Sequence, residues 1–119
     1  MTATVETGKL GEAMAKEYLK KQGYDIIEQN YRTKRAEIDI IAAKNRVLVF
    51  VEVRTKSSDQ FGTPEETINY GKRQKLIRNA VAYVARKKFT GAYRIDAICI
   101  VLGEGENPQR IDHYENIVE

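Results

Sequence analysis

Two acidic residues stand at positions where a buried β-strand ordinarily carries apolar side chains. Asp39 lies within EIDIIA and Glu52 within VFVEVR, and both segments are otherwise dominated by apolar residues. Asp and Glu are poor strand formers, and an ionised carboxylate in an apolar interior is costly unless it is paired, hydrogen-bonded or bound to a metal ion. These two positions are therefore the first candidates for chemistry in this chain.

A short turn joins the two acidic segments and predicts how their carboxylates meet. The strands are expected to pair antiparallel, which brings Asp39 and Glu52 within about one residue of facing each other. Because side chains alternate along a strand, Glu52, Arg54 and Lys56 point to one face. The sequence thus predicts two carboxylates with cations directly beside them.

This combination of groups fits metal-assisted phosphodiester hydrolysis. Carboxylates are hard oxygen ligands for Mg²⁺ or Mn²⁺, which polarises a phosphoryl oxygen and activates a water, while a cation offsets charge in the transition state. A buried network of ion pairs explains the same residues without a metal, with Asp39 and Glu52 paired to Arg54, Arg35 or Lys72. The local residues leave both interpretations open.

Basic residues are concentrated in one part of the chain, although the net charge is only +3. From Thr67 to Ile95 there are eight basic residues and no acidic one. The polar side of a predicted helix is a candidate surface for a nucleic-acid backbone, and it carries Lys72, Lys75, Arg78, Asn79 and Arg86. A solvated helix face is the alternative. Aromatic residues lie mostly at apolar positions, so nothing supports sequence-specific reading of bases.

The elements that must position these residues follow from periodicity and capping signals. A helix is expected from about Gly8 to Gln22 with Thr7 as its cap, and Glu12 lies at the edge of its buried face. Its predicted apolar stripe consists of Leu10, Ala13, Met14 and Tyr18. Strands are expected over residues 24–29, 37–43, 46–54, 93–102 and 110–114, with a loop at 30–35 and a turn at 44–45.

The connection between the third and fourth strands contains the second helical region. Phe61-Gly62 and Thr63-Pro64 are interpreted as staple and cap residues of a helix start. A further helix is expected over 72–88, with Gly71 breaking the preceding one and Gly91 closing the region. The order predicts one α/β domain over residues 1–119, with a mixed central sheet flanked by helices.

The composition excludes other kinds of site. Cys99 and His113 are the single cysteine and the single histidine, which excludes a disulfide framework, Cys-rich zinc sites and His-rich metal sites. The longest apolar run, Val47–Val51, is too short to cross a bilayer, and no signal-peptide pattern is present. A cytoplasmic protein that does not engage a membrane is expected.

The order of sequence blocks resembles a known family. The blocks are GKLGEAMAKEYLKKQGYDIIEQNYR, AEIDIIA, VFVEVRTK, FGTPEETI, KRQKLIRNAVAYV and YRIDAICI. Together they resemble the YraN-type bacterial family, which is similar to archaeal Holliday-junction resolvases of the PD-(D/E)XK, restriction-endonuclease-like superfamily. The resemblance covers about Thr7 to Leu102. It implies a restriction-endonuclease-like core of order α-β-β-β-α-β and a structure-selective, Mg²⁺-dependent endonuclease acting on DNA.

The resemblance also implies roles for individual residues. Asp39 and Glu52 would hold the metal ion together with the backbone carbonyl of Val53, and Glu12 would be an outer or third ligand. Asp96 matches a recurrent Asp of the last core strand and is interpreted either as structural or as a group that supports the metal ligands from behind. The implied catalytic set is Glu12, Asp39, Glu52, Arg54 and Lys56, and the implied nucleic-acid contacts are Lys72, Lys75 and Arg78. Resolvase-like relatives act as homodimers, so a homodimer is expected.

The chain departs from the superfamily pattern at two positions. Ala36 replaces the usual Gly before EID, and Arg54 occupies the position of the superfamily Lys. A buried Lys can lose its proton and act as a base, whereas Arg stays protonated. Arg54 could still orient the scissile phosphate through a bidentate contact, and Lys56 could take the place of the Lys. A non-catalytic nucleic-acid binder and a protein-interaction domain are the alternatives.

Overall fold

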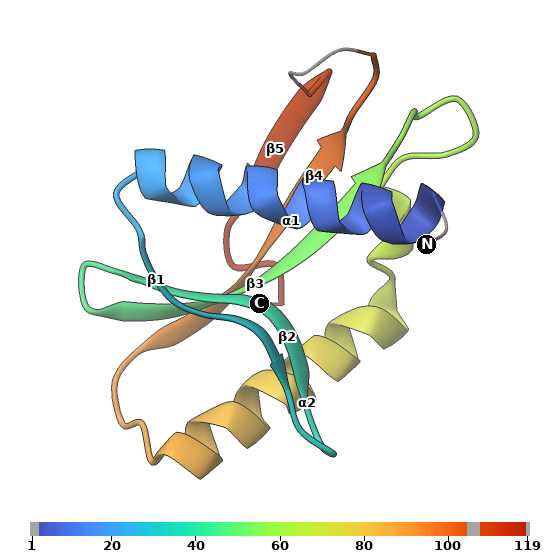
Figure 1. Cartoon of the computed structure of the whole chain (residues 1–119). Helices are drawn as coiled ribbons and strands as arrows, with labels where there is room; N and C mark the ends of the chain where they lie inside the picture. Colours follow the sequence, from blue (N-terminus) through green and yellow to red (C-terminus); the bar gives the residue numbers. More distant parts are fainter. Residues whose placement is uncertain (1–2, 105–107, 119) are drawn as a thin grey trace.

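The chain folds into helices and strands that follow the predicted order. The computed structural model describes residues 3–104 and 108–118. The elements are α1 (Ala3–Lys21), β1 (Asp25–Arg32), β2 (Glu37–Lys44), β3 (Val47–Lys56), the 3₁₀-helix η1 (Glu65–Thr67), α2 (Tyr70–Lys87), β4 (Tyr93–Val101) and β5 (Arg110–Tyr114). Within the described ranges they form a mixed α/β fold, in which one five-stranded sheet has helices on its two faces (Figure 1).

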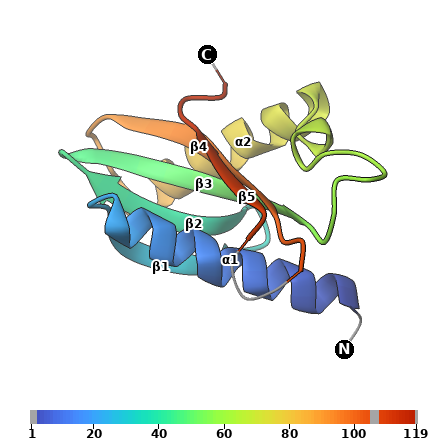
Figure 2. The same cartoon turned by 90° about the horizontal axis from the view of Figure 1, so that it is seen from above.

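The sheet order is β1-β2-β3-β4-β5. β1, β2 and β3 form an antiparallel meander, β3 and β4 run parallel, and β5 returns antiparallel beside β4. Parallel pairing needs a crossover connection, and α2 lies within this one (Figure 2). β3 is central in the sheet and covered on both faces, as its unbroken apolar run predicts.

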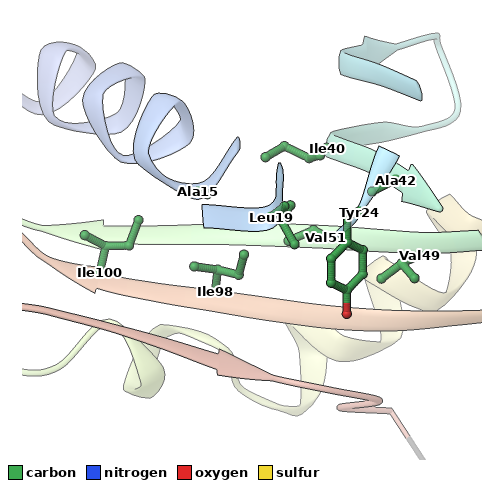
Figure 3. Packing of buried hydrophobic residues seen from close by; sticks show 9 residues of the cluster. All are labelled: Ala15, Leu19, Tyr24, Ile40, Ala42, Val49, Val51, Ile98 and Ile100. Carbon is green, nitrogen blue, oxygen red and sulfur yellow. The ribbon is translucent and has the colours of Figure 1, made fainter. Parts of the chain in front are cut away.

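Apolar side chains pack in two clusters, one on each face of the sheet. The cluster beneath α1 is drawn in Figure 3 and consists of Ala15, Leu19, Tyr24, Ile40, Ala42, Val49, Val51, Ile98 and Ile100. The cluster beneath α2 consists of Ile38, Ile41, Leu48, Phe50, Leu76, Ala80, Tyr83 and Ile95. Alternate residues of β3 therefore anchor opposite layers. Neither described helix is long and apolar enough to span a membrane.

Helix α1 packs on the sheet through a different stripe from the predicted one. The helix begins at Ala3, so Thr7 lies inside it and is not its cap. The buried positions recur every four residues, at Gly11, Ala15 and Leu19. Leu10 and Ala13 of the predicted stripe are exposed. Met14 and Tyr18 of the predicted stripe do pack against the core cluster, so the prediction was wrong only for Leu10 and Ala13. The small residues Gly11 and Ala15 face the sheet and allow the helix axis to approach it.

Gly11 is the point of closest approach between α1 and β3. A Cβ atom at this position would lie 2.8 Å from both Cβ and Cγ2 of Thr55, and closer still to its Oγ1. Real Cβ atoms essentially never come this near to another heavy atom. The absence of a side chain at Gly11 therefore sets the distance between α1 and β3, and with it the position of Glu12.

Two of the predicted strand boundaries shift. β1 continues to Arg32, so the predicted loop at 30–35 shrinks to a tight turn. In that turn the Thr33 N–H donates to the Ala36 carbonyl at 2.8 Å, and Thr33 Oγ1 accepts the Ala36 N–H at 3.1 Å. The β2–β3 turn lies at Asn45-Arg46, whose φ angles of 52° and 67° are typical of a two-residue hairpin turn. It therefore lies beyond the predicted 44–45.

The cap of η1 is confirmed, and its hydrophobic staple is wrong. Thr63 N–H donates to Glu66 Oε2, and Glu66 N–H donates to Thr63 Oγ1, both at 3.3 Å, which is a capping box around Pro64. Phe61, the predicted staple, is 91% exposed. The loop between β3 and η1 therefore presents this ring to solvent instead of packing it.

Helix α2 starts and ends at residues other than those predicted. Asn69 caps its start, because Asn69 Oδ1 accepts the Lys72 N–H at 2.9 Å. Gly71 was predicted to break the preceding helix, but η1 already ends at Thr67 and Gly71 lies in the first turn of α2. Lys88, with φ of 55°, is the C-cap, so the helix ends before Gly91. Lys72, Lys75 and Arg78 lie within both the predicted and the observed helix.

Asp96 has the structural role that its position in β4 suggested. Its side chain is fully buried and accepts hydrogen bonds from Arg94 Nε at 3.0 Å and from the Asn116 N–H at 2.9 Å. His113 Nε2 lies 2.8 Å from Asp96 Oδ2. These contacts join β4, β5 and the segment after β5, and the hydrogen bonds from His113 and Arg94 lower the pKa of Asp96 despite its burial.

Candidate active site

The sheet forks between β2 and β3, and the two acidic residues lie at the fork. The β2–β3 pairing ends at Ile40 and Val51, whereas β3 stays paired with β4 as far as Lys56. Beyond Val51, β2 remains paired only with β1, and the two strands bend away together (Figure 1). Continuing the register by one residue places Asp39 opposite Glu52, as the sequence predicted.

The Asp39 carboxylate occupies the place of the missing strand pairing. Its Oδ2 accepts the backbone N–H of Val53 at 2.8 Å. The N–H and C=O of a strand residue point to the same side, so the Val53 carbonyl also faces the fork. Two side-chain carboxylates and one backbone carbonyl are therefore directed at this gap.

Glu52 is buried between two cations. Its side chain is 7% exposed, and its Oε2 lies 2.9 Å from Arg54 Nε and 3.2 Å from Lys72 Nζ. The contact with Arg54 does not have hydrogen-bond geometry, so Nε is a buried donor without a hydrogen-bond acceptor among the described residues. The ion pairs expected of a buried network thus exist for Glu52, from Arg54 and Lys72. Arg35, the other expected partner, is exposed in the turn before β2.

The fork changes the acidity of its carboxyl groups. Burial, and then the negative charge of Glu52, raise the pKa of Asp39 to about 8. Burial raises the pKa of Glu12 as well, followed by the charges of Glu52 and Glu37. No three acidic, His or Cys side chains among the described residues gather closely enough to hold a metal ion by themselves. Glu12 is thus in electrostatic contact with the fork without completing a three-carboxylate cluster.

Two neighbouring pockets divide the predicted residues between them. The fork opens into a polar pocket of about 220 Å³, lined by Glu37, Asp39, Glu52, Val53, Arg54, Lys72, Lys75 and Asn79. A second pocket of about 510 Å³ is lined by Thr7, Gly8, Glu12, Val53, Arg54, Thr55, Lys56, Ser57, Pro64 and Thr67. Val53 and Arg54 line both pockets, so the two are adjacent.

The structure brings most, but not all, of the predicted residues together. Asp39, Glu52 and Arg54 line the fork pocket with Lys72 and Lys75. Glu12 and Lys56 line the adjacent pocket. Arg78 lines neither of these two pockets and is exposed on α2.

Asn79 belongs to the fork pocket, and the sequence prediction of an exposed side chain was wrong. Asn79 is 5% exposed, and its Nδ2 donates to the Glu37 carbonyl at 2.8 Å. This bond fixes α2 to the first residue of β2. The helical spacing from Leu76 to Asn79 and on to Tyr83 was the available signal, since these positions share one helix face.

Comparisons with known proteins support the resemblance found in the sequence. A family model described as uncharacterised protein family UPF0102 matches residues 11–100. A UPF0102 protein of Thermodesulfovibrio yellowstonii is 43% identical, over 96% of each chain. A UPF0102 protein of Alkaliphilus metalliredigens is 44% identical over 92% of this chain and 93% of its own length. A UPF0102 protein of Persephonella marina is 46% identical over 79% of this chain and 82% of its own length. The chain, identified above with the YraN-type proteins, belongs to the UPF0102 family.

Proposed function

We propose that this chain is a metal-dependent phosphodiesterase that cuts branched DNA, with the fork as its active site. The observation that carries the proposal is the position of Asp39 opposite Glu52 where the β2–β3 pairing ends, with Arg54 and Lys72 beside them. Carboxylates and cations that meet in one polar pocket are the groups that phosphodiester hydrolysis requires. The order α-β-β-β-α-β supports a restriction-endonuclease-like core.

The oxygen atoms at the fork fit Mg²⁺ or Mn²⁺. Asp39 and Glu52 offer carboxylates and Val53 a carbonyl that faces the same gap. Mg²⁺ is usually held by one or two carboxylates and keeps several of its waters, so a third carboxylate is not needed. A divalent cation would also relieve the repulsion between the buried Glu52 and the half-buried Asp39. When bound, the metal would polarise the phosphoryl oxygen and lower the pKa of an attacking water.

The cations of the fork would hold the phosphate. Arg54 has a buried Nε–H that lacks an acceptor among the described residues, and a phosphate oxygen would supply one. Lys72 and Lys75 line the same pocket and would contact the flanking backbone. Arg54 cannot serve as a base because it stays protonated. Lys56 lies in the adjacent pocket with Glu12 and is the remaining candidate for proton transfer.

The test compares carboxylate variants on a four-way DNA junction in the presence of Mn²⁺. Asp39→Asn and Glu52→Gln are expected to lose cleavage while keeping the circular-dichroism spectrum and the junction affinity. Glu17→Gln is the matched control, because Glu17 is an exposed carboxylate on α1. Junction cleavage by Asp39→Asn and Glu52→Gln at the wild-type rate would show that the fork is not the active site.

A non-catalytic nucleic-acid binder is the second candidate, and Arg54 at the usual Lys position favours it. In that case Lys72 and Lys75 would still bind the backbone, and affinity would fall steeply with salt. Long incubation with Mn²⁺ would then give no cleavage by the wild-type protein. Under either candidate we propose a cytoplasmic protein that acts as a homodimer on DNA. Sedimentation with and without a junction would test the homodimer.

A further inference from the structure

The loop between β3 and η1 holds one aromatic ring out in solvent. Phe61 is 91% exposed, and the residues around it are bound to one another. The Gly62 N–H donates to the Asp59 carbonyl at 3.3 Å, and the Gln60 N–H donates to Ser58 Oγ at 3.3 Å. The capping box of η1 fixes the loop at its far end. The ring is therefore presented by a built turn and not by a loose chain.

Gly62 is needed for this presentation. Its φ of 124° is a conformation that side chains rarely adopt, and a Cβ there would lie 3.0 Å from Glu66 Oε2. The Asp59–Gly62 hydrogen bond closes a turn with Gln60 and Phe61 at its centre, and Gly62 leads from this turn to Thr63 in the capping box. The turn thus requires glycine at position 62 because of its backbone conformation, and not because of packing alone.

The loop forms part of the rim of the proposed active site. It starts at Ser57 and ends at Pro64, and both residues line the pocket that contains Arg54 and Lys56. On the α2 side, Tyr70 is 70% exposed, two residues before Lys72. One exposed aromatic ring therefore lies in the loop that borders the pocket next to the fork, and a second lies in the first turn of the helix that supplies Lys72 to the fork.

An aromatic ring beside a phosphate-binding site fits an unstacked nucleobase. Every base has a face that can stack on such a ring, so the contact is independent of sequence. In a fully paired duplex these faces are buried between neighbouring bases, whereas a branch point or a single strand exposes them. Two of the nearby carboxylates are already engaged, Glu65 with Arg110 and Glu66 in the capping box, whereas Asp59 of the same turn is exposed to solvent.

We propose that Phe61 stacks on an unstacked base next to the bound phosphate and selects branched DNA over a continuous duplex. The proposal rests on the proposed function, because it assumes that the fork binds nucleic acid. Tyr70, exposed two residues before Lys72, provides a second ring for a neighbouring base.

The chain has no tryptophan, so a Phe61→Trp variant gives a single fluorophore at the proposed contact. We would titrate it without metal against a four-way junction, a single strand and a fully paired duplex. Junction and single strand are expected to quench the emission, and the duplex to leave it unchanged. Ile27→Trp is the control, since Ile27 is 48% exposed on the outer strand β1, and its emission should not respond.

Affinity provides the second measurement. Phe61→Leu keeps an apolar side chain but removes the ring, so its affinity for the junction should fall by about tenfold and its duplex affinity by less than about twofold. Tyr70→Leu is expected to act in the same direction.

The outcomes separate this proposal from the proposed function. If the junction binds but the emission of Phe61→Trp is unchanged, or if the duplex quenches it equally, the stacking proposal is wrong and the fork assignment stands. If the wild-type protein binds no nucleic acid, both fail. If the emission depends on protein concentration without DNA, Phe61 contacts a second copy of the chain, and the stacking proposal is overturned.

Discussion

Replacing Gly11 by Ala tests the packing of α1 on β3, because two effects of opposite sign compete at this position. Gly in a helix interior is about 1 kcal/mol less favourable than Ala, so helix propensity alone predicts a gain in stability. The added Cβ would lie 2.8 Å from the Cβ of Thr55, which rotation of the Thr55 side chain cannot relieve. Overpacking of this kind costs about 1–3 kcal/mol.

The packing cost is expected to win, because the obstructing atom is attached to the β3 backbone. We expect Gly11→Ala to lower the free energy of unfolding by about 1–2 kcal/mol, or the melting temperature by about 4–8 °C. Gly8→Ala in the same helix is the matched control, since a Cβ at Gly8 meets no atom within 4 Å. That variant should gain about 0.5–1 kcal/mol.

Urea denaturation followed by circular dichroism measures both variants. Combining Gly11→Ala with Thr55→Gly removes the obstructing atoms, so the double variant should be more stable than the sum of the single effects by about 1 kcal/mol. Equal stabilities for Gly11→Ala and Gly8→Ala, or strictly additive effects in the double variant, would refute the close approach of α1 to β3.

Three further predictions concern the rest of the fold. Asp96→Ala leaves the Arg94 guanidinium without its buried partner and should cost about 3–5 kcal/mol in urea unfolding; a loss below about 1 kcal/mol would contradict the network. Hydrogen bonds from Arg110 lower the pKa of Glu65 to about 2 from its ordinary 4.5, so their contribution is complete above about pH 5 and is lost as the pH falls toward 2. Arg110→Gln should therefore destabilise the protein near neutral pH. The difference in unfolding free energy between the variant and the wild type should shrink as the pH of the measurement is lowered from about 5 toward 2. Burial raises the pKa of Cys99 to about 12, so a thiol reagent near about pH 8 should label the unfolded chain and spare the folded one.

The strands and the acidic pair were predictable because short-range rules decide them. The apolar run of β3, and a turn short enough to force antiparallel pairing, brought Asp39 and Glu52 together before any tertiary contact was known. The buried stripe of α1 was not predictable in this way. It depends on how close two backbones can come, and that distance is set by Gly11 against Thr55, residues far apart in the sequence.

The sequence did not predict which residues of α2 face the fork, and the reason is different from that for α1. Periodicity along α2 groups Lys72 with Lys75, but whether a residue faces the fork depends on the angle at which α2 crosses the sheet. Asn79 was placed on the wrong side for this reason, although its spacing from Leu76 offered a signal. Phe61 resembled a staple in the sequence because an apolar residue before a cap usually packs, and nothing local indicates that this loop turns it outward.

The connection between β3 and β4 divides the site between two parts of the chain that can mutate separately. The carboxylates belong to a meander whose hydrogen bonds join residues close in the sequence, whereas Lys72 and Lys75 come from α2 within the long crossover. Substitutions in the crossover can therefore change the charge and length of the side chains at positions 72 and 75. Asp39 and Glu52 are unaffected by such substitutions. The hydrogen bond from Asn79 to the Glu37 carbonyl joins α2 to β2, so it limits how far these two parts of the chain can diverge independently.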